Sequence, residues 1–284
     1  MKKLTLILFI LCPFFLINCG GSDDTPDTPT ENSIIPTEGP DSPLSYPNMT
    51  LVWQEEFEGN SLNLDSWTYE IGTGQNGWGN NELQYYTDDN TSLIEGNLVI
   101  TAKKENVGGR EYTSSRIITE DKHSFQYGRI DVRAALPEGQ GMWPAIWMLG
   151  SNFRTVGWPS CGEIDIMEMV GGNGRENTVL GTAHWSNNGS HAEFGGTRTL
   201  PFGSFHGVYH VFSIVWNESS ISWLVDNQQY HVLDITPAEL DEFKNQFFFI
   251  LNIAVGGNLP GPPNASTSFP QHLVVDYIRV FQEN

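Results

Sequence analysis

Positively charged residues are scarce in this chain. Its 284 residues include 14 Lys and Arg against 34 Asp and Glu, which gives a formal net charge of −20 at pH 7. A field of this sign repels polyanions, so it argues against nucleic acid as a partner and favours a neutral or cationic one.

Long apolar runs are also few, and the longest lies at the N-terminus. There Lys2 and Lys3 precede an apolar run from Leu4 to Leu16. This is the layout of a secretory signal peptide, and the run is too short to span a bilayer. We expect residues 1–18 to be a signal peptide and the protein to be exported.

Cysteine is scarce as well, with Cys12 in the signal peptide, Cys19 directly after it and Cys161 in the body of the chain. Once the signal is removed, no internal disulfide is expected. Residues 16–19 resemble a bacterial lipobox, although Asn18 departs from the small residue usual there. We expect a lipid on Cys19 that anchors the protein to the outer membrane or cell surface, the alternative being a secreted protein with an incidental cysteine.

Large apolar residues are rare between the signal and residue 47. From Gly20 to Pro47 there are six Pro, six acids and no Lys or Arg. Such a segment buries too little apolar surface to order itself, so residues 19–47 are expected to form a disordered tether. The remaining residues, 48–284, show no second linker and are expected to form one domain.

Short segments with period-two patterning dominate this domain, at residues 97–103, 127–135, 209–216, 220–225 and 272–281. In Arg129–Ala134 polar and apolar residues alternate strictly, as in a sheet with one solvated face. Residues 247–255 are apolar almost throughout, which is typical of a strand covered on both faces. The pattern predicts an all-β fold, a two-sheet antiparallel sandwich of the jelly-roll kind.

Residues 162–172 carry three acids within one predicted strand. In an ideal strand Glu163 and Asp165 share a face and Glu168 falls on the other, which would bury a Glu in the core. One extra residue, a β-bulge at residues 166–167, restores the phase and puts all three acids on the same face. We therefore predict a bulge at this point.

The bulge also sets the spacing of the two glutamates. Their Cα atoms would be roughly 13 Å apart, so the carboxyl groups can approach to about 5 Å, the separation at which glycosidases retain anomeric configuration. Asp165 between them should make the cluster titrate jointly and hold a proton tightly. The acids alone leave open a solvated acidic strand or a cation site.

The segments around this strand are distinctive, notably residues 78–86, 116, 141–150, 157–161, 182–185 and 275–277. With the acidic strand they closely resemble glycoside hydrolase family 16, specifically its bacterial endo-β-1,3-glucanase (laminarinase) branch, from about residue 53 to 281. The resemblance implies a concave substrate cleft in which Glu163 is the nucleophile, Glu168 the general acid/base and Asp165 the support of the nucleophile. Spacing alone does not say which Glu attacks.

A glucan cleft needs aromatic platforms for the apolar faces of sugar rings, with polar groups beside them. The ordinary alternatives are core packing for a Trp, a turn or surface ion pair for an Asn or Arg, and a structural role for a His. The substrate-binding residues that the resemblance implies are Trp143, Trp147, Trp158, Asn80, Arg116 and His184.

The resemblance implies no cofactor for catalysis but a structural Ca²⁺ on the convex face, held by backbone carbonyls and one carboxylate. The matching positions are Glu56, Gly96 and Asp276. Oxygen ligands of this kind suit Ca²⁺.

Three functions compete at this stage. The first is an endo-acting retaining hydrolase of β-1,3-glucan, with mixed-linkage β-1,3/1,4-glucan as a further substrate. The second is an enzyme of the agar or carrageenan type, disfavoured because sulfated galactans are polyanions. The third is a non-catalytic β-glucan-binding protein, disfavoured because all three acids are present. The partner is expected to be a neutral β-glucan, and the protein a monomer.

Overall fold

The structure is a computed structural model, in which residues 34–284 are described. The expected signal peptide, Cys19 and the first part of the expected tether lie outside the described residues. Within residues 34–284, no helix is both long and apolar enough to cross a membrane.

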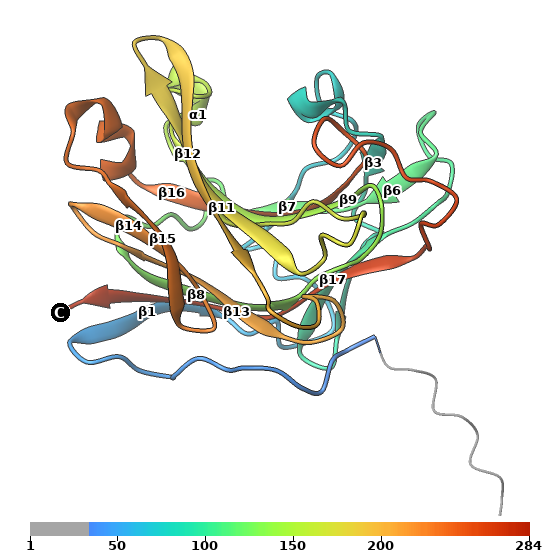
Figure 1. The fold of residues 1–284 in the computed structure, drawn as a ribbon, viewed down its shortest axis with the longest axis horizontal. Helices are drawn as coiled ribbons and strands as arrows, with labels where there is room; N and C mark the ends of the chain where they lie inside the picture. The colour runs from blue at the N-terminus through green and yellow to red at the C-terminus, as the bar shows by residue number, and fades with distance from the viewer. Residues whose placement is uncertain (1–33) are drawn as a thin grey trace, which may run out of the picture. The chain divides into compact units, whose positions relative to one another are not determined.

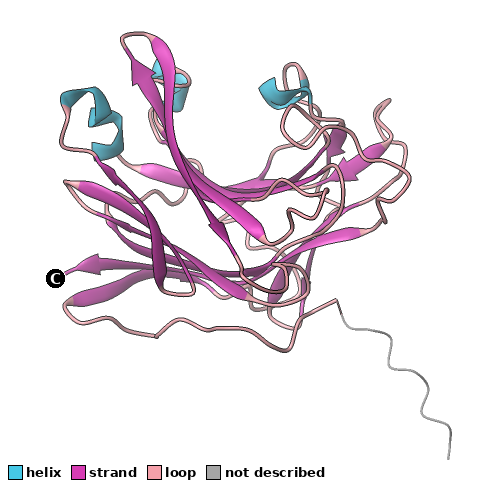
Figure 2. Ribbon diagram, in the orientation of Figure 1, coloured by secondary structure: helices cyan, strands magenta, loops and turns pink. Residues whose placement is uncertain are grey.

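Two antiparallel sheets face each other and account for most of the domain (Figures 1 and 2). The lower sheet in Figure 1 has eight strands, in the order β15-β14-β13-β8-β17-β5-β4, with β1 paired to β17. These strands are β1 (Met49–Glu55), β4 (Thr91–Ile94), β5 (Asn97–Ala102), β8 (Gly128–Ala135), β13 (His210–Trp216), β14 (Ser220–Val225), β15 (Gln228–Asp234) and β17 (Gln271–Glu283).

The upper sheet has seven strands in the order β12-β11-β10-β9-β16-β7-β2. These are β2 (Thr68–Tyr69), β7 (Arg116–Ile118), β9 (Met142–Gly150), β10 (Glu163–Glu168), β11 (Thr178–Asn187), β12 (Ser190–Thr199) and β16 (Phe247–Val255). A small parallel sheet joins β3 (Gln84–Tyr86) to β6 (Tyr112–Ser114). The short helical segments are η1 (Gly77–Asn81), α1 (Phe153–Val156) and η2 (Ala238–Lys244). The predicted all-β two-sheet sandwich is confirmed.

The main core fills the space between the sheets. Alternate residues of β8, including Ile130 and Val132, meet alternate residues of β9 and β10, including Ile146 and Ile164. Strand β16 is buried along its whole length, as the sequence predicted. Its second face is covered because Phe248 and Ile250 pack in a separate cluster with Cys161 and neighbouring residues. The outer face of the upper sheet is thus partly apolar at one end and free to carry polar side chains elsewhere.

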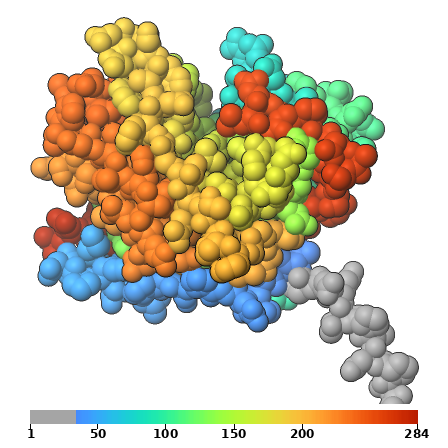
Figure 3. All heavy atoms as spheres, viewed as in Figure 1, coloured from blue at the N-terminus to red at the C-terminus, as the bar shows by residue number. Residues whose placement is uncertain are grey.

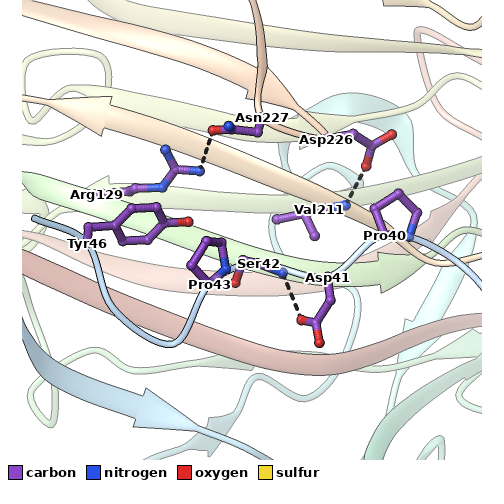
Figure 4. Close-up of a pocket in the computed structure, with 9 residues that line it drawn as sticks. All are labelled: Pro40, Asp41, Ser42, Pro43, Tyr46, Arg129, Val211, Asp226 and Asn227. Atoms are coloured by element: carbon purple, nitrogen blue, oxygen red, sulfur yellow. Dashed lines mark hydrogen bonds between the residues drawn. The ribbon is translucent and has the colours of Figure 1, made fainter.

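The N-terminal segment of the described chain, residues 34–47, lies across the outer face of the lower sheet (Figure 1). Ile35 is buried in a cluster with Tyr209, and the guanidinium of Arg133 donates to the backbone carbonyls of Gly39 and Pro40. A cavity of about 60 Å³ remains between segment and sheet, and Figure 4 shows the residues that line it. In residues 34–47 the structure therefore differs from the expected disordered tether.

This segment also changes the environment of β8. The alternation in Arg129–Ala134 is present, but the expectation of a solvated face is wrong, because Asp131 has no exposed surface. The hydroxyl of Tyr46 donates to Oδ2 of Asp131 over 2.7 Å, and the Tyr46 ring lies under the guanidinium of Arg129. The N-terminal segment thus covers polar side chains on this face and supplies Asp131 with one of its partners.

Candidate active site

The acidic strand β10 contains the predicted bulge. Against β9, Asp165 is paired with Trp147 and Met167 with Ile146, so the register shifts at Ile166. Ile164, Ile166 and Met167 all lie in the core between the sheets. The extra residue thus lets two neighbouring apolar side chains face inward, and Glu168 returns to the face that carries Glu163 and Asp165.

Each of the three carboxyl groups has a ring N–H beside it. The indole of Trp158 donates to Oε2 of Glu163 over 2.9 Å, and the indole of Trp143 donates to Oε1 of Glu168 over 2.7 Å. Nε2 of His184 lies 3.0 Å from Oδ2 of Asp165. Among the described residues, no Lys or Arg forms an ion pair with these acids. The negative charges are therefore held by neutral donors and one imidazole.

Burial without a strong cation shifts the titration of all three groups in the same direction. Burial and the charge of Asp165 raise the pKa of Glu163 to about 8. Burial and Glu193 raise the pKa of Asp165 to about 7, and burial and Asp165 raise the pKa of Glu168 to about 7. The cluster can therefore hold protons near neutral pH, as an acid catalyst requires. Because all three values rise, they do not distinguish the acid from the nucleophile.

The other sheet supports the acidic strand β10 from below. The indole of Trp223, on β14, donates to the backbone carbonyl of Asp165 over 2.7 Å. The indole passes Gly181 on the way, and a Cβ at that position would lie 2.3 Å from Cδ1 of Trp223. Glycine at 181 is therefore what allows a buried aromatic ring to reach the strand at its bulge.

Two projections rise beside the acidic strand and leave a hollow between them (Figure 3). One is the β11–β12 hairpin, drawn in yellow, and the other combines the segment around η1, in cyan, with a red segment near residue 260. Within the hairpin, His184 is paired directly opposite Glu163. Strand β10 is a central strand of the upper sheet, so its acids lie on the sheet surface that the projections flank.

Residues 76–277 match the family described as glycosyl hydrolases family 16. The chain belongs to this family. Its fold is similar to the laminarinase catalytic domain from Thermotoga maritima MSB8, with a TM-score of 0.78 and 46% identity over 84% of this chain and 99% of that one.

This chain matches most of one curated relative but only about a third of another. A beta-glucanase from Rhodothermus marinus is 40% identical over 260 residues, covering 86% of this chain and 89% of that protein. The clotting factor G alpha subunit from Tachypleus tridentatus is 42% identical over 241 residues, or 84% of this chain, which spans only 34% of that longer protein. The predicted family is confirmed. The prediction that the chain is a glycoside hydrolase is confirmed as well.

The three tryptophans predicted from the resemblance to family 16 differ in burial. Trp143 is 8% exposed and bonded to Glu168, whereas Trp158 is 46% exposed and bonded to Glu163. Trp147 is half-buried, and its indole donates to Oδ1 of Asn252 over 2.8 Å. Because each of these indoles donates a hydrogen bond to an acid of β10 or to Asn252, core packing alone does not account for them.

Arg116 lies between two aromatic rings, 4.5 Å from the centroid of Trp78 and 4.9 Å from that of Trp147. Its Nε also donates to Glu70 over 2.5 Å. The amide of Asn80 donates to Glu82 over 3.3 Å. Both predicted residues thus belong to a polar network at the side of the sheet where η1 projects.

The residues predicted to hold Ca²⁺ meet at one point of strand β17. Strand β5 pairs with β17 up to Val275, and β1 pairs with the same edge from Ile278 onward. Asp276 lies in the bulge between these two stretches, so Glu56, after β1, and Gly96, before β5, flank it. Arg133 donates to Oδ2 of Asp276 over 2.6 Å.

Sequence reasoning missed several polar residues near the site. Glu82 accepts from Gln84 and Tyr86, and Tyr86 accepts from Asn252 beside Trp147. His191 and Glu193 on β12 lie next to His184. The only available signal for the last two was a His-x-Glu pair in a strand, which is too common a pattern to single out.

Proposed function

We propose that this chain is an endo-acting retaining β-1,3-glucanase, with Glu163 as nucleophile, Glu168 as general acid/base and Asp165 as the support of Glu163. The observation that carries the proposal is the bulged strand, which gathers three carboxyl groups, one buried and two partly buried, on one face without a Lys or Arg partner among residues 34–284. Solved and curated relatives named laminarinase or beta-glucanase support the substrate. The net charge of −20 also favours a neutral polysaccharide over a sulfated one.

The reaction would proceed in two displacements. In the first, the Glu163 carboxylate attacks the anomeric carbon while Glu168 gives its proton to the departing glycosidic oxygen, which leaves a covalent glycosyl-enzyme. In the second, Glu168 takes a proton from water, and the resulting hydroxide equivalent displaces Glu163. The configuration at the anomeric carbon is inverted twice and so retained.

The substrate is tested by product analysis on laminarin, lichenan, curdlan, agarose and carrageenan. Reducing ends from laminarin, with little or none from agarose and carrageenan, are expected. Binding of laminarin without release of reducing ends would support a non-catalytic binding protein, and release from the galactans would support the agar type.

The residue roles are tested with Glu163→Gly and Glu168→Gly on an aryl β-glycoside of a laminari-oligosaccharide in the presence of azide. In Glu163→Gly azide should displace the aglycone directly and give an α-glycosyl azide. In Glu168→Gly it should attack the glycosyl-enzyme and give the β-anomer. The opposite pairing of variant and anomer would reverse the two roles.

We also propose a structural Ca²⁺ bound by the backbone carbonyls of Glu56 and Gly96 and by the carboxylate of Asp276. Support comes from the strand register, which brings the three residues to one junction, and from the oxygen-only ligand set. Thermal unfolding with and without chelator tests it. An unchanged midpoint, in a protein whose metal content is measured, would contradict it.

A lipid on Cys19 stays a prediction, and we propose it as the anchor. The first described residues lie on the outer face of the lower sheet, away from the acidic strand (Figure 1). A chain tethered at this side would leave the cleft accessible. Membrane fractionation of Cys19→Ala should then find activity in the soluble fraction, whereas activity that stays with the membrane would refute lipidation at this residue.

A further inference from the structure

Three atoms able to bind a metal converge on the β11–β12 hairpin beside the catalytic acids. Nδ1 of His184 lies 2.9 Å from Nε2 of His191. Oε2 of Glu193 lies 3.5 Å from the former and 3.7 Å from the latter. Each atom faces the other two, so one ion could contact all three.

The strand register explains this convergence. His184 is paired directly with Glu193, and His191 is paired with Ser186, two residues further along β11. Because successive side chains of a strand point to opposite faces, positions 191 and 193 share one face of β12. That face is the one on which His184 lies. The triangle is therefore built by backbone pairing and does not depend on a loop.

We propose that His184, His191 and Glu193 form a binding site for Zn²⁺ or a similar first-row divalent cation, and that an ion bound there inhibits the enzyme. Zn–N distances of about 2.0–2.1 Å in a tetrahedron place neighbouring ligand atoms about 3.3–3.4 Å apart. The three observed separations, 2.9, 3.5 and 3.7 Å, bracket this value. Two imidazoles and one carboxylate also suit Zn²⁺ better than Ca²⁺, which takes oxygen ligands.

The surroundings of His184 fit a metal ligand. Its other ring nitrogen, Nε2, lies 3.0 Å from Oδ2 of Asp165. A carboxylate in this position holds the proton on Nε2 and directs the lone pair of Nδ1 outward, which is the usual support of a histidine that binds zinc. The side chains of His191 and Glu193 are 38% and 62% exposed, so an ion can enter from solvent and complete its coordination with water.

Inhibition follows from where the ion would be. The ring of His191 lies 4.7 Å from that of Trp158, whose indole is bonded to Glu163. His184 contacts Asp165 directly. A bound dication would thus fix the imidazole beside the catalytic acids and place two positive charges at the wall of the cleft, where a glucan chain has to pass. Removal of the ion by a chelator should restore activity.

The first test measures binding alone. Mature protein without a polyhistidine tag is stripped of metal and titrated with Zn²⁺ by calorimetry, with His191→Ala and Glu193→Gln as variants. Loss of even an outer partner of a metal costs about 10–100-fold in affinity, so each variant should bind at least about tenfold more weakly. His206→Ala is the matched control, because His206 also has a single carboxylate, Glu138, at 3.7 Å but no third ligand. It should bind as the wild type does.

The second test measures inhibition and rests on the proposed function. Laminarin hydrolysis is followed against free Zn²⁺, each variant being compared with its own activity without metal. The concentration for half-inhibition should rise at least about tenfold in His191→Ala and Glu193→Gln, and Ca²⁺ at the same concentrations should not inhibit.

The outcomes distinguish a failure of the metal site from a failure of the proposed activity. Zn²⁺ affinity that is unchanged in both variants, as for an ion held by Glu163 and Asp165 instead, would overturn the site. Binding at the site without inhibition would overturn its regulatory effect. Failure to hydrolyse laminarin would overturn the proposed function, and the calorimetric titration would still decide whether the site exists.

Discussion

Carboxylates on opposite sides of the sandwich, Asp131 on one and the three acids of β10 on the other, have different environments. On the outer face of the lower sheet, Asp131 accepts hydrogen bonds from the guanidinium of Arg129, the hydroxyl of Ser213 and the hydroxyl of Tyr46. On the upper sheet, Glu163, Asp165 and Glu168 face one another with indoles and one imidazole as partners. Both groups occupy strand faces that point away from the central core.

The difference shows that burial of a carboxylate does not by itself indicate catalysis. Asp131 has a cation and two hydroxyl donors, so its charge is compensated and its role is to hold the N-terminal segment to the sheet. The acids of β10 lie together, one buried and two partly buried, without such compensation, and this keeps protons on the cluster near neutral pH. In the proposed mechanism this cost in stability prepares them for acid and nucleophilic catalysis.

The largest expected effect comes from Glu163→Ala. Loss of the nucleophile should lower laminarin hydrolysis on the order of 10⁴-fold or more, while the protein stays folded because an uncompensated acid has been removed. Reducing-end assays measure the activity, and circular dichroism verifies the fold. Turnover within tenfold of the wild type would contradict the mechanism.

Asp131→Asn should lower stability and leave activity unchanged, the opposite of Glu163→Ala. Removal of this charge leaves Arg129 buried without its ion-pair partner, which should cost about 3–5 kcal/mol of unfolding free energy. Hydrolysis per folded molecule should not change, because the cluster of β10 lies on the other sheet. Urea unfolding and activity assays measure the two quantities. A loss of activity without a loss of stability would show that the two carboxylate groups are coupled.

Trp143→Phe compares the two glutamates of the acidic strand through their indole partners. It removes the indole N–H that stabilises the ionised form of Glu168, so the pKa of Glu168 should rise further above its ordinary value. The alkaline limb of the pH–rate profile should therefore move to higher pH, and kcat/KM should fall about tenfold from loss of a hydrogen bond worth about 1.5 kcal/mol. Trp158→Phe is the matched control, since its effect should fall on Glu163. An alkaline limb that does not move would remove Glu168 from the role of acid.

The smallest expected effect concerns stability against pH. Because the folded-state pKa of Glu163 is raised from 4.5 to about 8, the folded protein binds more protons than the unfolded chain between these pH values. Stability therefore falls as pH rises through this window. Glu163→Gln should weaken this dependence and raise the melting temperature at pH 8 by about 2–4 °C, which corresponds to about 1 kcal/mol. A steeper dependence in the variant would contradict the expected sign.

Much of the fold was predictable because it rests on periodic patterns. Strands β14 and β16 have the predicted bounds, and the bulge in β10 followed from the cost of burying Glu168. The burial of β8 by an N-terminal segment was not predictable. Residues 34–47 have no periodicity, and their attachment depends on isolated contacts, among them buried Ile35, the hydroxyl of Tyr46 and backbone carbonyls that accept from Arg133. Such contacts leave no signal in composition.

The site was predictable to a different degree. The resemblance to family 16 indicated which residues to examine, and the structure brings Trp143, Trp158 and His184 to the three acids. The contributions of His191 and Glu193 required the pairing of β11 with β12, because two residues seven or more positions from His184 become neighbours only in that register.

The central claim is that the acids of β10 hold protons near neutral pH because they are buried together without a strong cation. Carbon-13 NMR titration of the glutamate side-chain carboxyls, in the wild type and in Glu163→Gln and Glu168→Gln, tests it most directly. The account predicts that the acids retain a proton well above pH 4.5 in the wild type and that either substitution alters this shared titration. Titration of both groups near 4.5, the ordinary glutamate value, would contradict it.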